Sequence, residues 1–147
     1  MGFKFRYEAL LSLRERLKEQ AEIELAGARK QLREARDRLD LYQGRYHQAR
    51  DAFESRLKRP IPSGEICSYR DYLAGLSEKI SAQGVEIGKR EELVREKIRD
   101  LMAKTKQYRV MEKLKEKDLI KWRDQQFQEE QKWMNEVAIT RHGRPFL

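Results

Sequence analysis

An apolar or small residue recurs at alternating intervals of three and four positions between residues 25 and 53. Most of the residues between these positions are charged or polar. The repeating positions are Leu25, Ala28, Leu32, Ala35, Leu39, Tyr42, Tyr46, Ala49 and Phe53. An uninterrupted run of heptads with charged flanks is typical of a coiled-coil seam. Because a single helix cannot bury such a stripe alone, the pattern requires another helix packed against it.

The first helix is expected over about residues 5–57. Before the regular heptads, its apolar positions are Leu10, Leu13, Leu17, Ala21 and Leu25, spaced three and then four, four and four. Successive intervals of four insert a stutter into a heptad pattern. The sequence therefore predicts a local unwinding of the supercoil near the start of this helix.

Residues 58–64 interrupt the helical pattern because Pro60 and Pro62 remove backbone donors and restrict the residues before them. A second helix is expected over about residues 64–140, followed by a short C-terminal tail. Its seam begins with Ile66, Tyr69, Leu73, Leu76, Ile80, Gln83 and Ile87. The sequence leaves open whether this helix is continuous through Gly84 and Gly88. The prediction is an all-α chain of one domain, residues 1–147, folded as a long antiparallel two-helix coiled-coil hairpin.

Folding about Ile61 places residue 61−k opposite residue 61+k, so Phe5 faces roughly Lys117. The second helix continues past that point without a partner in the chain, yet it carries Trp122, Phe127, Trp133 and Met134 there. Large apolar residues at helical spacing on an unpaired segment indicate a contact surface for another protein or for a second copy of the chain.

Tyrosines gather in the half of the predicted hairpin nearer the turn. The fold places Tyr46 across from about Leu76 and Tyr42 across from about Ile80, with Tyr72 close by. Two interpretations remain open: these residues pack on one another in the seam, or they form an aromatic patch available to a partner.

Charge and motifs indicate a binding protein and not an enzyme. The chain is 39% charged with a net charge of +8, but Glu or Asp interrupts each basic run. This favours a solvated helix exterior, with an acidic protein partner as the alternative and nucleic acid as a remote one. No phosphate-binding glycine loop, metal-ligand cluster or catalytic pair is recognisable, so we expect no enzymatic activity, small-molecule substrate, metal or cofactor. The single cysteine, Cys67, and the lack of a signal peptide or membrane-spanning run favour the cytoplasm.

The order of several short motifs resembles the flagellar export protein family FliJ over nearly the whole chain. The motifs are Phe3-x-Phe5-x-Tyr7-Glu8-x-Leu10-Leu11-x-Leu13-Arg14-Glu15, Glu19-Gln20-Ala21, Tyr69-x-x-Tyr72-Leu73-x-x-Leu76, Lys113-Leu114-Lys115-Glu116-Lys117 and Glu130-Gln131-Lys132-x-x-x-Glu136-x-Ala138-x-x-Arg141.

The resemblance implies a cytoplasmic component of the flagellar type III export apparatus, peripherally associated with the inner membrane and used in flagellum biogenesis and motility. It implies a hairpin similar to the γ-subunit stalk of rotary ATPases, placed in the centre of the hexameric export ATPase ring and bridging it to the export gate protein FlhA. Export chaperones are further implied partners. The carried-over gate-contact patch is Leu39, Tyr42, Tyr46, Tyr72 and Leu76, with Lys79 and Gln83 on the same face. We place the ATPase-ring contact at Leu13, Leu17, Leu119, Trp122, Phe127 and Trp133.

Two related functions remain as alternatives. In the first, the chain is an escort that recycles export chaperones and uses its C-terminal segment as a helix bound in a groove. In the second, the chain is a stalk homologue from a virulence type III secretion system. The sequence does not distinguish which chaperones are handled, whether the stalk rotates or whether the free protein is monomeric.

Overall fold

The computed structural model describes residues 2–143, and these residues form two helices and no strand. Helix α1 spans Glu8–Arg56 and helix α2 spans Ser63–His142. The predicted all-α antiparallel hairpin is confirmed. Helix α2 continues without a break through Gly84 and Gly88, which settles the question that the sequence left open.

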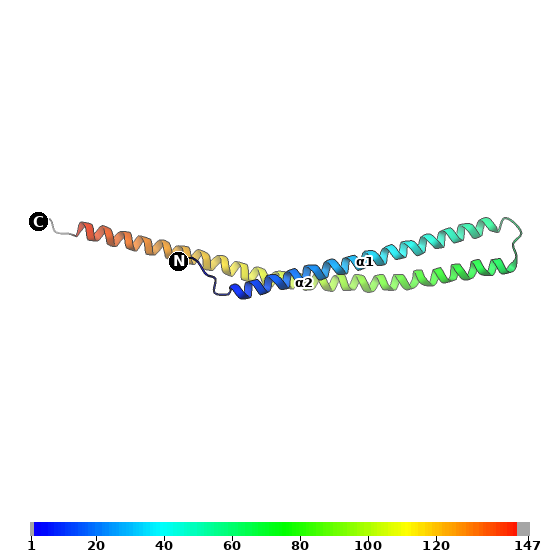
Figure 1. Ribbon diagram of the computed structural model, residues 1–147, viewed down its shortest axis with the longest axis horizontal. Helices are drawn as coiled ribbons and strands as arrows, with labels where there is room; N and C mark the ends of the chain where they lie inside the picture. Colours follow the sequence, from blue (N-terminus) through cyan, green and yellow to red (C-terminus); the bar gives the residue numbers. More distant parts are fainter. Residues whose placement is uncertain (1, 144–147) are drawn as a thin grey trace. The chain divides into compact units, whose positions relative to one another are not determined.

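The chain divides into two compact units, which we describe separately. The hairpin unit comprises residues 20–102, and the terminal unit comprises residues 1–19 together with residues 103–147. In the hairpin unit, the cyan part of α1 and the green part of α2 run side by side and are joined by the turn (Figure 1). In the terminal unit, the first turns of α1 pack against α2 near Met111.

The predicted seam is the buried face of the hairpin unit. Every member of the nine-residue series from Leu25 to Phe53 is buried or half-buried. The facing residues of α2 from Ile66 to Ile87 are likewise buried or half-buried, with Leu76 and Gln83 the most enclosed. The heptad spacing therefore identified both sides of this interface, because each seam position projects toward the partner helix.

Cross-helix contacts confirm the predicted register about Ile61. The rings of Phe53 and Tyr69, eight positions before and eight after Ile61, lie with centroids 5.0 Å apart. Farther from the turn, Arg90 donates to Gln31 at 2.7 Å. These pairs fix the hairpin to within about one residue of the predicted alignment.

The turn between the helices is held by the last residue of α1. Arg56 donates to both carboxylate oxygens of Glu65, at 3.0 and 3.3 Å, and to the carbonyl of Pro60 at 3.2 Å. A bidentate guanidinium–carboxylate pair fixes orientation better than a single contact does. Arg56 therefore joins the end of α1 to the first turn of α2.

The terminal unit differs from the prediction in its seam. Leu10 and Leu13 are exposed, whereas Leu11 is buried against Phe5 and Met111. From Leu11 the inward positions follow unbroken heptad spacing through Arg14 and Lys18. The predicted stutter is therefore wrong.

Arg14 and Lys18 take seam positions because their polar ends find partners on α2. Arg14 donates to Gln107, and the Lys18 ammonium lies 4.9 Å from the centre of the Tyr108 ring. Long basic side chains pack their apolar stems along a helix while the charged group reaches a polar or aromatic partner. A search restricted to apolar residues misses such positions.

Candidate partner-binding surfaces

The five residues that the family resemblance implies for contact with the export gate all belong to the hairpin unit, but they differ in accessibility. Leu39, Tyr42 and Tyr46 are half-buried members of the seam. Leu76 is 4% exposed, so its side chain supports the patch from within. Tyr72 is 52% exposed and is the member most available to a partner.

Two of these tyrosines also contact neighbours that helical spacing alone does not pair with them. The Lys79 ammonium lies 5.8 Å from the centre of the Tyr42 ring, a cation–π arrangement. The Tyr46 ring meets the His47 ring edge-on at 6.0 Å. Lys79, which lies on the same face as the patch, is therefore a partner of Tyr42.

The six residues assigned to ring contact all belong to the terminal unit, but they do not share one face. Leu13 is exposed on one side of α1. Leu119 lines a groove on the other side of the same helix pair, together with Tyr108 and Glu112. Leu17 is half-buried. A single partner surface would therefore contact only some members of this set.

The N-terminal segment ahead of α1 covers Trp122, one of the six residues assigned to ring contact. The Phe3 ring packs against the Trp122 ring with centroids 6.0 Å apart, and Trp122 is half-buried as a result. Phe5 is buried beside Leu11 and Met111, which anchors the segment ahead of α1. The predicted helix began at about residue 5, whereas α1 begins at Glu8, and the contact of Phe3 with Trp122 was not predicted. The alternation of Phe3 and Phe5 has the period of an extended chain and was the available signal.

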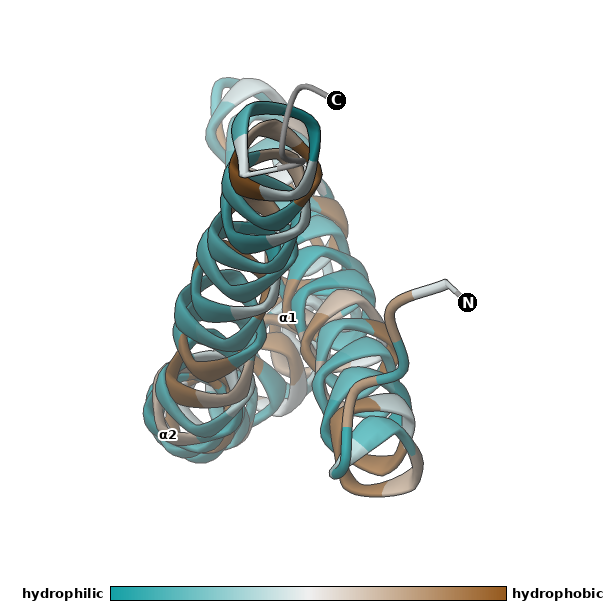
Figure 2. Cartoon of the chain, turned by 90° about the vertical axis from the view of Figure 1, so that its left-hand side faces the viewer, coloured by the Kyte–Doolittle hydropathy of each residue, from teal (hydrophilic) through white to brown (hydrophobic). Residues whose placement is uncertain are grey.

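The C-terminal part of α2 presents a broad apolar face. In the part of the chain that the structure describes, no other helix lies beside the orange and red end of α2 (Figure 1). Ile120, Phe127, Trp133 and Met134 are exposed there, Phe127 at 61% and Trp133 at 64%. At 100° per residue these side chains, with Trp122, fall within a face about 160° wide. Hydrophobic turns are visible among hydrophilic ones at this end of α2 in Figure 2.

The groove on one side of the terminal unit is acidic. Its walls carry Glu8, Glu15, Glu112 and Glu116 around Tyr108, with Lys115 as its cation. Lys115 pairs with Glu8 at 3.0 Å. Desolvation, followed by the nearby carboxylates of Glu112 and Glu15, raises the pKa of the Tyr108 phenol. Negative charge therefore dominates this groove.

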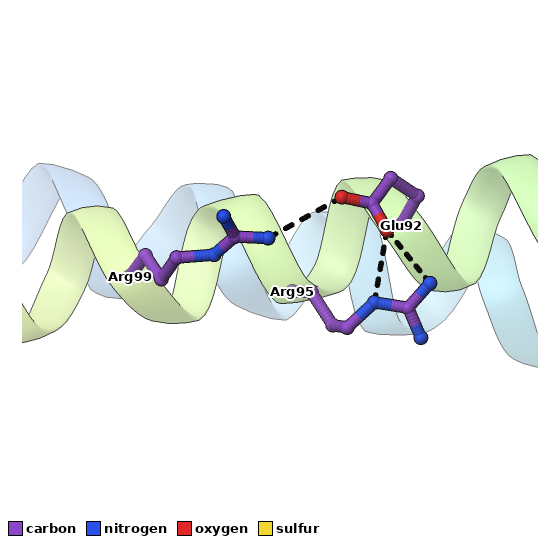
Figure 3. Close-up of polar contacts among 3 residues, drawn as sticks. All are labelled: Glu92, Arg95 and Arg99. Carbon is purple, nitrogen blue, oxygen red and sulfur yellow. Dashed lines mark hydrogen bonds and ion pairs between the residues drawn. The ribbon is translucent and has the colours of Figure 1, made fainter.

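A separate polar cluster lies on the exposed side of α2 in the hairpin unit (Figure 3). The Glu92 carboxylate accepts hydrogen bonds from Arg95 at 2.7 and 2.9 Å and from Arg99 at 3.3 Å. The Arg95 hydrogen bonds, and then its charge, lower the pKa of Glu92. Because these groups satisfy one another on a solvated helix, they fit a stabilising pair network better than a binding site.

The geometry defines a class of protein: a helical hairpin whose distinctive surfaces are suited to other proteins. Within residues 2–143, no helix is long and apolar enough to cross a membrane.

The family described as "Flagellar FliJ protein" matches residues 3–145, and the chain belongs to this family. Members of this family are non-catalytic components of the flagellar type III export apparatus, and the chain is therefore associated with that apparatus. The chain is also similar to a solved structure, CT670 of Chlamydia trachomatis, described as a YscO homolog. The two are 18% identical with a TM-score of 0.42, over 97% of this chain and 98% of the other. No curated protein sequence matches the chain.

Proposed function

We propose that the chain is the stalk of the flagellar export ATPase complex. In this role it promotes assembly and activity of the hexameric ATPase ring and links the ring to the export gate protein FlhA, without catalysing a reaction itself. Membership of the FliJ family supports a place in the export apparatus. The observation that carries the finer proposal is the exposed apolar face of α2 from Ile120 to Met134.

This face suits a protein partner because it concentrates aromatic side chains without covering them. Phe127 and Trp133 leave most of their area in water, and aromatic residues of this kind commonly dominate the free energy of protein association. The neighbouring Trp122 is already packed on Phe3. We therefore assign the main ring contact to Phe127 and Trp133.

The test measures ATP hydrolysis by the export ATPase as the chain is added. Phe127→Ala combined with Trp133→Ala should raise the concentration needed for half-maximal stimulation by at least about tenfold, because each hot-spot side chain contributes more than about 1 kcal/mol. Ile139→Ala is the matched control, since Ile139 is 70% exposed on the same helix but outside this face. Equal stimulation by the double variant and the control would contradict the ring assignment.

The gate contact is tested with Tyr72→Ala, because Tyr72 is the exposed member of the patch. Titration calorimetry against the cytoplasmic domain of FlhA should show weaker binding. Val85→Ala, at another exposed position of α2 in the hairpin unit, should bind as the original chain does. Unchanged affinity of the Tyr72 variant would remove this residue from the gate contact.

A chaperone-escort role is the second candidate, and the same exposed face favours it because an amphipathic helix can occupy a chaperone groove. The Phe127 and Trp133 double variant separates the two roles. Loss of chaperone capture with ATPase stimulation intact would support the escort role and displace the stalk proposal.

A further inference from the structure

The two sides of the terminal unit carry opposite charge. The acidic groove described above occupies one side, with Glu8, Glu15, Glu112 and Glu116. The inward positions of the two helices, Leu11, Lys18, Tyr108 and Met111, fix which residues project to the other side. By helical spacing, that side carries Leu10, Leu13, Arg16 and Leu17 of α1, and Lys106, Val110, Lys113, Leu114, Lys117, Asp118 and Lys121 of α2.

This second side combines an apolar floor with a basic rim. Leu10, Leu13 and Val110 are 37%, 47% and 60% exposed, and Leu17 and Leu114 are half-buried between the helices. The rim consists of Arg16 of α1 and the lysines of α2 named above. Asp118, four residues after Leu114, is a carboxylate on the same side, and the lysines outnumber it. The glutamates that intervene in the linear sequence, Glu8, Glu15, Glu112 and Glu116, line the acidic groove instead.

We propose that this side of the terminal unit is a docking surface for an amphipathic helix with acidic flanks, supplied by a partner protein. The apolar stripe of such a helix would lie on the floor formed by Leu10, Leu13 and Val110. Its carboxylates would meet Lys113 and Lys117 on the rim. Complementary charge across an interface accelerates association and selects the partner. An apolar strip along two packed helices suits a third helix better than a flat lipid surface.

This inference rests in part on the proposed function, because Leu13 and Leu17 were also assigned to ring contact. The docking surface on the side of the helix pair is a second contact, in addition to Phe127 and Trp133 at the end of α2, and its partner has a stated chemistry. The acidic groove on the opposite side would repel the same partner. The surface is therefore specific to one side of the unit.

The experiment uses a synthetic fluorescent helix of about three heptads, with leucine along one stripe and glutamate on both flanks. Its binding to the full chain is measured by fluorescence anisotropy, beside a second probe with lysine at every glutamate position. The acidic probe should bind at least about tenfold more tightly than the basic probe, with affinity falling as salt rises. Equal affinity of the two probes would overturn the proposal.

Variants locate the site. Lys113→Glu with Lys117→Glu should weaken binding of the acidic probe by about tenfold or more, because two attractive rim pairs become repulsive. Lys30→Glu with Arg33→Glu makes the same change in net charge at exposed positions of α1 in the hairpin unit and should have little effect. Equal losses in both variants would show attraction to net charge alone and would refute the site.

A matched pair of variants tests the apolar floor. Leu13→Ser should weaken binding of the probe, whereas Ile23→Ser, at an exposed position of α1 in the hairpin unit, should not. Circular dichroism establishes that each variant remains helical. Normal binding by the Leu13 variant would remove the apolar floor from the proposal.

Two further outcomes would overturn the proposal in favour of another occupant. The first is that the chain sediments with phosphatidylglycerol vesicles, that the Lys113 and Lys117 reversals abolish this sedimentation, and that the acidic probe does not bind. This result would identify an anionic lipid surface as the occupant. A dimer in analytical ultracentrifugation that the same reversals dissociate would identify a second copy. Because the probe assay contains no ATPase and leaves Phe127 and Trp133 intact, its failure is distinguishable from failure of the stalk proposal.

Discussion

Replacing Gln83 by leucine tests how the seam of the hairpin unit is held together. Gln83 is the one buried polar residue among the described side chains, and its amide donates to the carbonyl of Ala35 at 2.8 Å. Ala35 lies inside α1, where its carbonyl also accepts the backbone N–H four residues later. Removal of the glutamine amide therefore does not leave this carbonyl without a partner.

The expected change in stability follows from what each side chain contributes. The hydrogen bond of Gln83 contributes about 0.5–1.5 kcal/mol net. Its two buried methylenes contribute roughly 0.8 kcal/mol each. A leucine buried at the same position contributes about 1.5–3 kcal/mol, with no amide to desolvate. These contributions nearly cancel, so we expect Gln83→Leu to change the free energy of unfolding by no more than about 1.5 kcal/mol in either direction.

Urea unfolding followed by circular dichroism measures this difference. Gln43→Leu is the control because Gln43 is exposed on α1, and its replacement should change stability by less than about 0.5 kcal/mol. Destabilisation of the Gln83 variant by more than about 2 kcal/mol would contradict this expectation, since it would show that the hydrogen bond contributes more than about 1.5 kcal/mol. We also expect the variant to tolerate alternative helix alignments, because a single polar seam residue helps to specify register.

Three other changes test separate parts of the structure. Leu32→Ala removes a buried seam side chain and should lower the free energy of unfolding by about 2–3 kcal/mol, measured by urea denaturation; a loss below about 1 kcal/mol would place Leu32 outside the core. Arg95→Ala should raise the pKa of Glu92 toward its usual value in an NMR titration, because Arg95 is the main cause of the lowered pKa. In the original chain, the stabilising contribution of Glu92 is present above its unfolded-state pKa and is lost as pH falls through the lower folded-state pKa. An unchanged Glu92 titration in the variant would contradict this assignment. Phe3→Ala should expose Trp122 and shift its fluorescence to longer wavelength, measured with Trp133 replaced by phenylalanine; an unchanged spectrum would show that Phe3 does not shield the indole.

Much of the hairpin unit was predictable because its seam obeys a strict period. Leu25, Leu32 and Ala35 recur at heptad spacing and are buried, and the paired prolines near Ile61 mark the turn. Once the turn was located, antiparallel pairing placed Phe53 near Tyr69. Spacing and chain breaks are properties that a sequence displays directly.

The terminal unit was harder to predict because side-chain environment overrides residue type there. Arg14 and Lys18 project inward while Leu10 and Leu13 remain exposed, the reverse of an assignment by hydrophobicity. The contact of Phe3 with Trp122 joins residues far apart in the sequence, and periodicity within one helix does not reveal it.

The candidate surfaces were predicted in part. Exposed aromatic residues at the end of α2 follow from its length beyond the paired region, and Phe127 and Trp133 are accessible. The sequence grouped Leu76 with Tyr72, although Leu76 is buried and Tyr72 is exposed. Choosing between seam and surface at such positions requires the packing of both helices.

We propose that the export ATPase ring covers the C-terminal part of α2. Hydrogen–deuterium exchange of the chain, measured with and without the hexameric ATPase, tests this contact. We expect the ATPase to slow exchange mainly in residues 119–142, where backbone amides of an unpaired helix open readily in the free chain. Unchanged exchange in that segment, with the ATPase demonstrably bound elsewhere on the chain, would contradict it.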